Sequence, residues 1–354
     1  MTVYYLCFTD VQQPIGGVKV LYKQVDILNQ NGIDAAIVHR TQGFRCTWFD
    51  NETKVLHPDI LLAKGDVLAL PEAMAPRLAE IAPGVAKVII NENAFHTWDG
   101  VPALSDHPYT QGGDLLGVTC MSEQNRTLLK YAFPQLEVVI LPVSLDPLVY
   151  GASVSPWRGR RIAYMPRKRA AESQQVLGML HARGALRGWE VVALTGMNQR
   201  QVAEELGKTA LFLSFSEHEG FGLPPLEALA SGCFVIGYTG FGAAEYFDEG
   251  FTTEVPDGDV VAFAQTVEAW LDAWDGDAEL QRPFAASRHA LDGYPPAREA
   301  EALLGFFQPV LARAASGASA VSVLTAGNLR MEPEAKPSLV KRTGRAVRAF
   351  QRSD

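Results

Sequence analysis

Short apolar runs alternate with amphipathic stretches along most of this chain, and the alternation predicts strands followed by helices. Apolar runs of strand length lie at 3–8, 35–38, 67–70, 86–90, 117–121, 162–165, 190–194, 210–215 and 234–237. Helices are predicted at 18–32, 72–81, 122–133, 171–181, 199–206, 224–232, 243–247, 260–274 and 296–313. This alternation indicates an α/β protein with parallel, doubly wound sheets.

One irregular stretch interrupts the pattern. Residues 147–161 are rich in glycine, serine and proline, which predicts a linker. The chain has 354 residues, more than one hydrophobic core usually holds. We therefore expect one α/β domain at 1–150, a second at 151–313, and a spacer with a basic C-terminal tail at 314–354.

The stretch from Glu219 to Glu227, with the sequence EGFGLPPLE, joins a predicted strand to a predicted helix. Its glycines let backbone amides approach a ligand closely, and the helix N-terminus favours anionic groups. Pro224 and Pro225 suit a first helical turn, where a missing N–H costs nothing. The two carboxylates could face a single cleft, where they would bind hydroxyl groups beside a phosphate.

The same stretch resembles the E-x7-E motif of retaining GT-B glycosyltransferases (glycosyl transferases group 1, family 4). The resemblance implies two Rossmann-like domains facing across a central cleft, with the acceptor on the N-terminal side and a nucleotide-sugar donor on the C-terminal side. It implies that Glu219 and the following amides hold the donor sugar, while Glu227 binds the ribose hydroxyls. The donor-binding residues of this stretch are then Glu219, Gly220, Phe221, Gly222, Leu223 and Glu227. The alternative is a strand–loop–helix joint with two solvated glutamates.

Two segments of the first half match the same family less specifically. The Gly16-Gly17 turn, between a strand and a helix, resembles the segment whose amides lie under the donor's diphosphate and sugar. Glycine turns are common, so the turn alone is weak evidence for a site. His96 follows the strand at 86–90, near the point where related enzymes place a histidine on the donor sugar. A surface or core histidine is the alternative for His96.

A basic turn follows the first strand of the second half. Arg167, Lys168 and Arg169 stand where a diphosphate would need countercharge. The resemblance implies an arginine and a lysine on the leaving phosphates, but the spacing here departs from the family's. Arg167 is the clearest match, and Lys168 or Arg169 could supply the second charge; a solvated basic turn is the alternative. We predict that Arg167, Lys168 and Glu219 are the catalytic residues.

Two acidic features of the second half are predicted to be structural. Asp257-Gly258-Asp259 reads as D-x-D, the metal motif of another glycosyltransferase fold, but Asp259 directly precedes a predicted helix and suits its N-cap. Glu245 is expected to orient a loop or cap a helix. We therefore expect no metal ion, and no cofactor beyond the nucleotide-sugar substrate.

The composition of the chain limits the cellular compartments and the binding partners that we expect. The formal charge of −9 argues against a general nucleic-acid binder. Four cysteines scattered singly fit a reducing cytosol, and neither a signal peptide nor an apolar run of membrane-spanning length is present, so we expect a cytoplasmic protein. The basic residues of 336–354 predict either peripheral contact with an anionic membrane or a solvated tail.

Three functions compete at this stage. The first is transfer of a sugar from a nucleotide-diphosphate sugar to a glycan or lipid-linked acceptor, with retention and without a metal ion. The second is a non-catalytic GT-B subunit that binds nucleotide or glycan. The third, a nicotinamide-dependent dehydrogenase, rests on the strand–glycine–helix opening, and the absence of G-x-G-x-x-G speaks against it.

Overall fold

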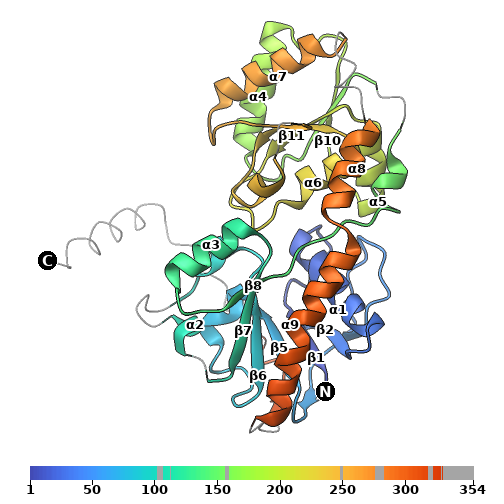
Figure 1. Cartoon of the computed structure of the whole chain (residues 1–354). Coiled ribbons are helices and arrows are strands. Elements are labelled where there is room, and N and C mark those ends of the chain that lie inside the picture. The colour runs from blue at the N-terminus through green and yellow to red at the C-terminus, as the bar shows by residue number, and fades with distance from the viewer. Residues whose placement is uncertain are drawn as a thin grey trace, which may run out of the picture.

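The computed structural model describes residues 1–101, 107–111, 113–155, 159–247, 250–275, 283–317, 322–327 and 329. It contains two open α/β sheets, which lie one above the other (Figure 1). Residues before the 147–161 stretch form the first sheet, and residues after it form the second. The predicted α/β class is confirmed.

The first sheet has the strand order β3-β2-β1-β5-β6-β7-β8, and the strands pair in parallel. Its strands are β1 (Val3–Cys7), β2 (Ala35–His39), β3 (Val55–Leu56), β5 (Val67–Pro71), β6 (Ala86–Ile90), β7 (Leu115–Cys120) and β8 (Val138–Ile140). Successive residues of β1 enter separate cores, since Tyr5 packs on one face and Tyr4 and Leu6 on the other. Burial on both faces explains the nearly continuous apolar runs in the sequence.

The helices of this domain are α1 (Gly16–Gln30), η1 (Glu72–Arg77), η2 (Ala94–His96), α2 (Pro108–Gln111) and α3 (Glu123–Ala132). Ser122 caps α3 as predicted, because its side chain accepts a hydrogen bond of 3.2 Å from the backbone of Asn125. The prediction of a helix over 72–81 is wrong in both the length and the type of the helix. It is a short 3₁₀ helix containing Pro76, which cannot donate the backbone hydrogen bond that an α-helix needs there.

The second sheet has the parallel order β10-β9-β11-β12-β13. Its strands are β9 (Arg161–Tyr164), β10 (Glu190–Ala193), β11 (Leu211–Phe215), β12 (Phe234–Tyr238) and β13 (Thr252–Glu254). Its helices are η4 (Gly151–Ser153), α4 (Ala170–Arg183), α5 (Gln199–Gly207), α6 (Leu223–Ala230), η5 (Gly242–Tyr246), α7 (Val260–Ala273) and α8 (Pro283–Gly293). Asp259 caps α7 as predicted, whereas the segment predicted as an α-helix at 243–247 is the 3₁₀ helix η5.

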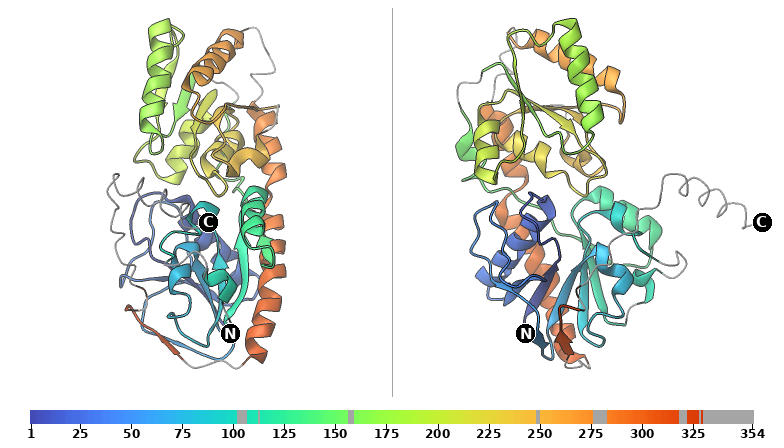
Figure 2. Two further views of the ribbon diagram at one scale, coloured as in Figure 1. Left: turned by 90° about the vertical axis from the view of Figure 1, so that its left-hand side faces the viewer. Right: turned by 180° about the vertical axis from the view of Figure 1, so that it is seen from behind.

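The last long helix, α9 (Pro296–Ser316), leaves the second domain and runs along the first (Figure 2). Phe307 packs on Tyr5 of β1 with ring centroids 5.9 Å apart, and Arg313 donates a hydrogen bond of 2.9 Å to the backbone of Leu116. Beyond it, β14 (Ser322–Leu324) pairs antiparallel with β4 (Ile60–Leu62). The basic segment that the sequence places at 336–354 lies outside the described residues.

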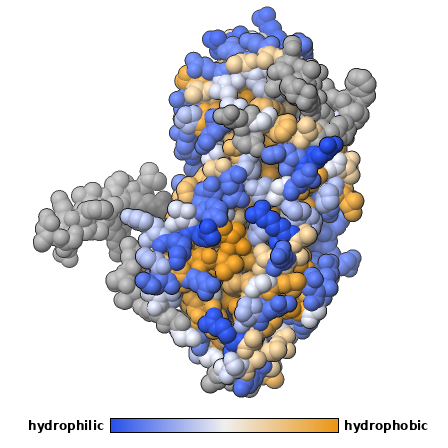
Figure 3. Space-filling model, in the orientation of Figure 1, coloured by the Kyte–Doolittle hydropathy of each residue, from blue (hydrophilic) through white to orange (hydrophobic). Residues whose placement is uncertain are grey.

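The surface of the protein carries both polar and apolar regions. Figure 3 shows polar side chains over much of the second domain and a group of apolar side chains over β7 and β8, between α3 and α9. This group follows from the position of β8 at the edge of its sheet, where Leu116, Val139 and Ile140 are only partly covered. No helix in the described part of the chain is long and apolar enough to cross a membrane.

Candidate active site

The loop between β11 and α6 carries the motif and is fixed by its neighbour after β12. Gly222 adopts a left-handed conformation with φ of 81° and begins α6, whose first turn takes Pro224 and Pro225. The backbone N–H of Glu219 donates a hydrogen bond of 2.8 Å to the carbonyl of Gly240. The strand–glycine–proline–helix joint predicted from the sequence is therefore present.

This loop presents unused backbone donors. Among the described residues, none accepts a hydrogen bond from the backbone N–H of Gly220, Phe221 or Gly222. The side chain of Phe221 is buried and packs between Tyr246 and Tyr294, with ring centroids 5.5 Å and 5.4 Å away. Any contact of Phe221 with a ligand would therefore come from its backbone.

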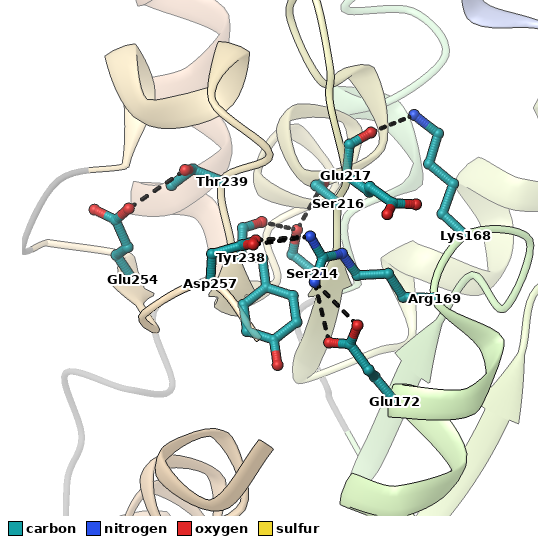
Figure 4. A network of polar contacts seen from close by, with 10 residues as sticks. All are labelled: Lys168, Arg169, Glu172, Ser214, Ser216, Glu217, Tyr238, Thr239, Glu254 and Asp257. Atoms are coloured by element: carbon teal, nitrogen blue, oxygen red, sulfur yellow. Dashed lines mark hydrogen bonds and ion pairs between the residues drawn. The ribbon is translucent and has the colours of Figure 1, made fainter. Parts of the chain in front are cut away.

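Glu219 faces the basic turn that follows β9. The ammonium group of Lys168 lies 2.7 Å from Glu219 Oε1. It also donates a hydrogen bond of 2.8 Å to the carbonyl of Glu217, which Figure 4 shows. Arg167 is exposed, and within the described ranges it forms no ion pair or hydrogen bond. The turn thus combines one lysine held beside Glu219 with one arginine that is available to a ligand.

The third cation of the turn is engaged elsewhere. Arg169 forms ion pairs of 3.0 Å with Glu172 and 2.8 Å with Asp257, and its guanidinium lies 4.9 Å from the centre of the Tyr238 ring (Figure 4). Burial opposes its charge, but the hydrogen bonds and charges of Asp257 and Glu172 raise the pKa of Arg169. Of the two candidates for the second charge, Lys168 is therefore the one beside Glu219.

Glu227, the second carboxylate of the motif, is nearly buried in a contact between the two domains. Its Oε1 lies 2.5 Å from the ammonium group of Lys19, at the start of α1, and accepts a hydrogen bond of 2.5 Å from Tyr150. Burial alone would lower the pKa of Lys19, but the charge of Glu227 raises it above its ordinary value. Burial raises the pKa of Tyr246 well above its ordinary value, and the charges of Glu219 and Glu227 add to this shift.

The glycine turn of the first domain meets the motif loop directly. A Cβ atom on Gly16 would lie 2.9 Å from Leu223 Cδ1, and one on Gly17 would lie 2.8 Å from Glu92 Oε1. Larger residues would displace these neighbours, which explains the glycines. The turn, Leu223 and Glu92 therefore lie against one another where the two domains meet.

Three further contacts hold the motif loop against the first domain. Asn93 donates a hydrogen bond of 2.7 Å to the carbonyl of His218, and the carbonyl of Gly220 accepts one of 2.7 Å from Ser122. Asn125 donates a second hydrogen bond to the same carbonyl of Gly220. These bonds fix the loop from the side opposite the second sheet.

Glu245 also orients this region. One of its carboxylate oxygens accepts a hydrogen bond of 3.1 Å from the backbone N–H of Glu123, at the start of α3, and the other accepts one of 3.3 Å from Tyr294. Burial raises the pKa of Glu245. The contacts place it as a bridge between η5 and α3.

A pair of carboxyl groups lies behind the glycine turn of the first domain: Glu72 is buried, and Glu92 is partly buried with its Oε1 covered. The side chain of Glu72 accepts hydrogen bonds from the backbone N–H groups of Glu92 and Asn93, at 3.0 Å and 3.2 Å. Burial raises the pKa of Glu72 to about 7. Burial, followed by repulsion from Glu72, raises the pKa of Glu92 well above its ordinary value.

His96 lies on η2, where its side chain is about half exposed and its Nδ1 lies 2.7 Å from Asp99 Oδ2. The adjacent Phe95 packs on His218 of the motif loop, with ring centroids 4.6 Å apart. The segment thus touches the loop through Phe95, and contact of His96 with a donor sugar stays a prediction.

Lys19, Tyr150 and Glu92 were not singled out from the sequence. Lys19 and Tyr150 lie far from Glu227 along the chain, and no local pattern connects them. A signal for Glu92 did exist, since it almost directly follows β6, and open α/β sheets bind ligands at the carboxyl ends of their strands.

Comparison with known proteins agrees with this geometry. Residues 181–285 match the sequence model of the family Glycosyl transferases group 1. An alpha-1,6-glucosyltransferase of Actinobacillus pleuropneumoniae serotype 7 (strain AP76) is 26% identical over 282 residues, covering 74% of this chain and 81% of the relative. These matches support a glycosyltransferase.

Solved structures show that the chain has the GT-B fold. Sucrose-phosphate synthase from Thermosynechococcus elongatus superposes with a TM-score of 0.63 at 10% identity, over 88% of this chain and 99% of that one. The pneumococcal O-GlcNAc transferase GtfA, solved with UDP and GlcNAc, superposes with a TM-score of 0.62 at 10% identity, over 89% of this chain and 99% of that one. The predicted GT-B fold is thereby confirmed.

Proposed function

We propose that this protein transfers a sugar from a nucleotide-diphosphate sugar to a glycan acceptor, with retention of the anomeric configuration and without a resident metal ion or cofactor. The observation that carries the proposal is the 2.7 Å pair of Lys168 and Glu219 beside the free amides of the motif loop. A carboxylate accepts hydrogen bonds from sugar hydroxyls, and a cation next to it stabilises the negative charge of the phosphate from which the sugar is transferred.

Departure of the nucleoside diphosphate is the step that these residues would assist. As the bond from the anomeric carbon to the phosphate oxygen breaks, negative charge grows on the diphosphate. Arg167 and Lys168 would stabilise that charge, together with the uncapped N-terminus of α1 at Gly16 and Gly17. Preorganised donors of this kind are worth about 10²- to 10³-fold each in rate.

The two motif carboxylates would bind different parts of the donor. Glu219 and the amides of Gly220 to Gly222 would hold the sugar, and Glu227 would hold the ribose hydroxyls. Because Glu227 Oε1 already accepts from Lys19 and Tyr150, the ribose would use the other oxygen or would displace Lys19. Displaced from Glu227, Lys19 would add a third positive charge near the diphosphate.

The names of similar proteins suggest a first donor and acceptor. The A. pleuropneumoniae relative is named an alpha-1,6-glucosyltransferase, and one structural neighbour was solved with UDP. UDP-glucose is therefore the donor to test first. Isomaltose is a matching acceptor, since an α-1,6 link between two glucose units is the link that it contains.

The test begins with donor binding. UDP-glucose, UDP-GlcNAc, GDP-mannose and ADP-glucose are added separately to the protein, and the melting temperature is recorded. A ligand at 100 times its Kd stabilises the native state by about 2.7 kcal/mol, which gives a readable shift. The donor that binds is then incubated with acceptor glycans, and NMR of the product gives the anomeric configuration.

Transfer with the donor's anomeric configuration would support the proposal, and the Glu219→Ala and Arg167→Ala variants should lose transfer while remaining folded. Binding without turnover across the acceptors would favour a non-catalytic subunit instead. A product of inverted configuration would contradict retention, and no thermal shift with any nucleotide sugar would contradict the donor site itself.

A further inference from the structure

An aromatic cluster lies beside the motif loop, where the two domains meet. Phe95, on η2 of the first domain, packs on His218 of the motif loop with ring centroids 4.6 Å apart. Phe241, on the loop after β12, meets the same Phe95 ring edge to face, with centroids 5.4 Å apart. Asn93 holds the Phe95 segment to the motif loop through its hydrogen bond of 2.7 Å to the carbonyl of His218. Three segments far apart in the sequence thus bring their aromatic rings together.

The cluster is adjacent to Glu219, the carboxylate proposed to hold the donor sugar. The backbone of Phe241 pairs with that of Glu219 in an isolated parallel bridge. The two loops lie so close that a Cβ atom on Gly242 would be 2.6 Å from the carbonyl oxygen of Glu219. Under the proposed function, a molecule bound on the cluster is therefore a near neighbour of the donor sugar.

Two of the three rings are open to solvent. Phe241 is 38% exposed and His218 is exposed, whereas Phe95 is partly buried. Among the described residues between 159 and 293, Val261 is the one other exposed large hydrophobic side chain. The imidazole of His218 forms no hydrogen bond with any described residue, so its nitrogens are available to a ligand. An exposed aromatic face beside hydrogen-bonding groups suits a ligand that is apolar on one face and polar around its edge.

The backbone holds both exposed rings in conformations that side chains rarely adopt. At Phe241 φ is 79° and ψ is −62°, and at His218 φ is 46°. The values at Phe241 are those of a γ-turn form that is rare and strained. Such strain persists where the surrounding structure enforces it, and it is concentrated at ligand-binding sites. Glycine would suit the backbone of Phe241 better, so the presence of an aromatic ring there indicates a use for the ring itself.

Resting on the proposed function, we propose that Phe241 and His218 form the surface on which a pyranose ring of the acceptor glycan stacks. A pyranose carries C–H groups on one face and hydroxyl groups around its edge. The C–H face packs on the electron-rich face of an aromatic ring, and the hydroxyl groups form hydrogen bonds with the imidazole of His218. Phe95 supports both rings from the first domain.

The position of the cluster favours the acceptor over the donor. In the proposed function the donor sugar already has its own polar groups, which are Glu219 and the amides of the motif loop. Phe95 and Asn93, which fix the cluster, come from the first domain, the side that the proposed function assigns to the acceptor. Phe241 would therefore contact the sugar that receives the transferred unit.

The experiment measures UDP release at saturating UDP-glucose while the concentration of isomaltose, or of the acceptor glycan that the transfer test identifies, is varied. Phe241→Gly removes the ring and leaves a residue that adopts this backbone conformation without strain, and thermal melting checks that it is folded. We expect the acceptor KM to rise about tenfold, kcat to fall less than about threefold, and the Kd for UDP-glucose to stay within about twofold. His218→Asn, which tolerates a left-handed backbone, should raise the acceptor KM about fivefold.

Two controls accompany these variants. Phe241→Tyr keeps a ring in place and should keep the acceptor KM within about twofold of wild type. Tyr131→Ala removes a ring that is 90% exposed on α3, away from the cluster, and should leave KM and kcat unchanged.

An acceptor KM of Phe241→Gly within about twofold of wild type would overturn the inference. A Kd for UDP-glucose that rises as much as the acceptor KM would also overturn it, because the ring would then stack on the donor sugar. If the wild type turns over no nucleotide sugar with any acceptor, the proposed function fails and this inference fails with it. If the wild type transfers and Phe241→Gly behaves as the wild type does, the inference alone fails.

Discussion

The ammonium group of Lys19 lies 2.5 Å from the carboxylate of Glu227, and this pair joins α1 of the first domain to α6 of the second. Tyr150 shares the contact, since its hydroxyl donates to Glu227 and accepts a hydrogen bond of 3.2 Å from Lys19. One donor-site carboxylate proposed for the second domain is therefore already held by the first. Under the proposed function, binding of a nucleotide sugar at Glu227 would be coupled to the contact between the domains.

Removing Lys19 should destabilise the protein. In Lys19→Met the nearly buried carboxylate of Glu227 loses the cation beside it, and Tyr150 remains as its partner among the described residues, so we expect a loss of about 2 kcal/mol in the free energy of unfolding. Urea denaturation at pH 7 measures it. The double variant Lys19→Met/Glu227→Gln should lose less than the sum of the single variants, because the two side chains interact. Additive losses would show that the pair contributes nothing.

Lys168 and Arg169 are adjacent in sequence but should have separate roles. Lys168→Met should slow UDP release by about 10²-fold or more and change stability by less than about 1 kcal/mol. Arg169→Met should do the reverse, because it removes the ion pairs that the nearly buried Arg169 side chain forms with Glu172 and with exposed Asp257, and we expect a loss of about 1–2 kcal/mol. Urea denaturation and UDP release, measured on both variants, check this. Equal losses of activity would contradict the assignment of Lys168 alone to the site.

Gly17→Ala should be destabilising because its Cβ would overlap the carboxyl group of Glu92. Overpacking of this kind costs about 1–3 kcal/mol. Gly178→Ala is the matched control, since that helical glycine has open space around it and gains up to about 1 kcal/mol from the better helix propensity of alanine. Thermal melts compare the variants, and the double variant Gly17→Ala/Glu92→Ala should recover stability. If it does not, the overlap is not the cause.

Stability should depend on pH through Glu72. Its pKa is about 7 in the folded protein, above the ordinary value of about 4.3, so the folded state binds more protons than the unfolded state between these values. The stabilisation is therefore complete below pH 4.3 and is lost as the pH rises through 7. Relative to wild type, Glu72→Gln should be more stable at pH 8 by on the order of 2 kcal/mol, and this gain should shrink toward pH 4.5. Urea denaturation at both pH values measures the difference, and a constant difference would exclude this titration.

Local patterns predicted the elements well, because each element has its own signal. The apolar run at β6, the cap at Ser122 and the cap at Asp259 all lie within a few residues of the structure they specify. The error at 72–81 has a local cause as well, since the pattern suggested a helix but Pro76 removes one of its backbone donors.

Contacts between distant segments could not be predicted in the same way. The motif itself identified Glu219 and Glu227, but their partners come from distant segments. Lys168 follows β9, the strand beside β11 in the same sheet, whereas Lys19 belongs to the first domain. Arg169 illustrates the limit, because its ion pair with Asp257, which lies far along the chain, helps to distinguish it from Lys168. Glu92 was missed since a single glutamate after a strand is common, and its contacts with Gly17 and Gly220 arise from three separate segments.

The most direct test compares UDP release from UDP-glucose by the wild type and by Glu219→Gln, with UDP affinity measured by calorimetry on the same preparations. Glu219 is proposed to hold the reacting sugar and to fix Lys168, whereas the nucleotide is bound by other groups. We predict turnover at least about 10²-fold slower in the variant, with the Kd for UDP within threefold of wild type. A Glu219→Gln protein that turns over UDP-glucose as fast as the wild type would contradict the account.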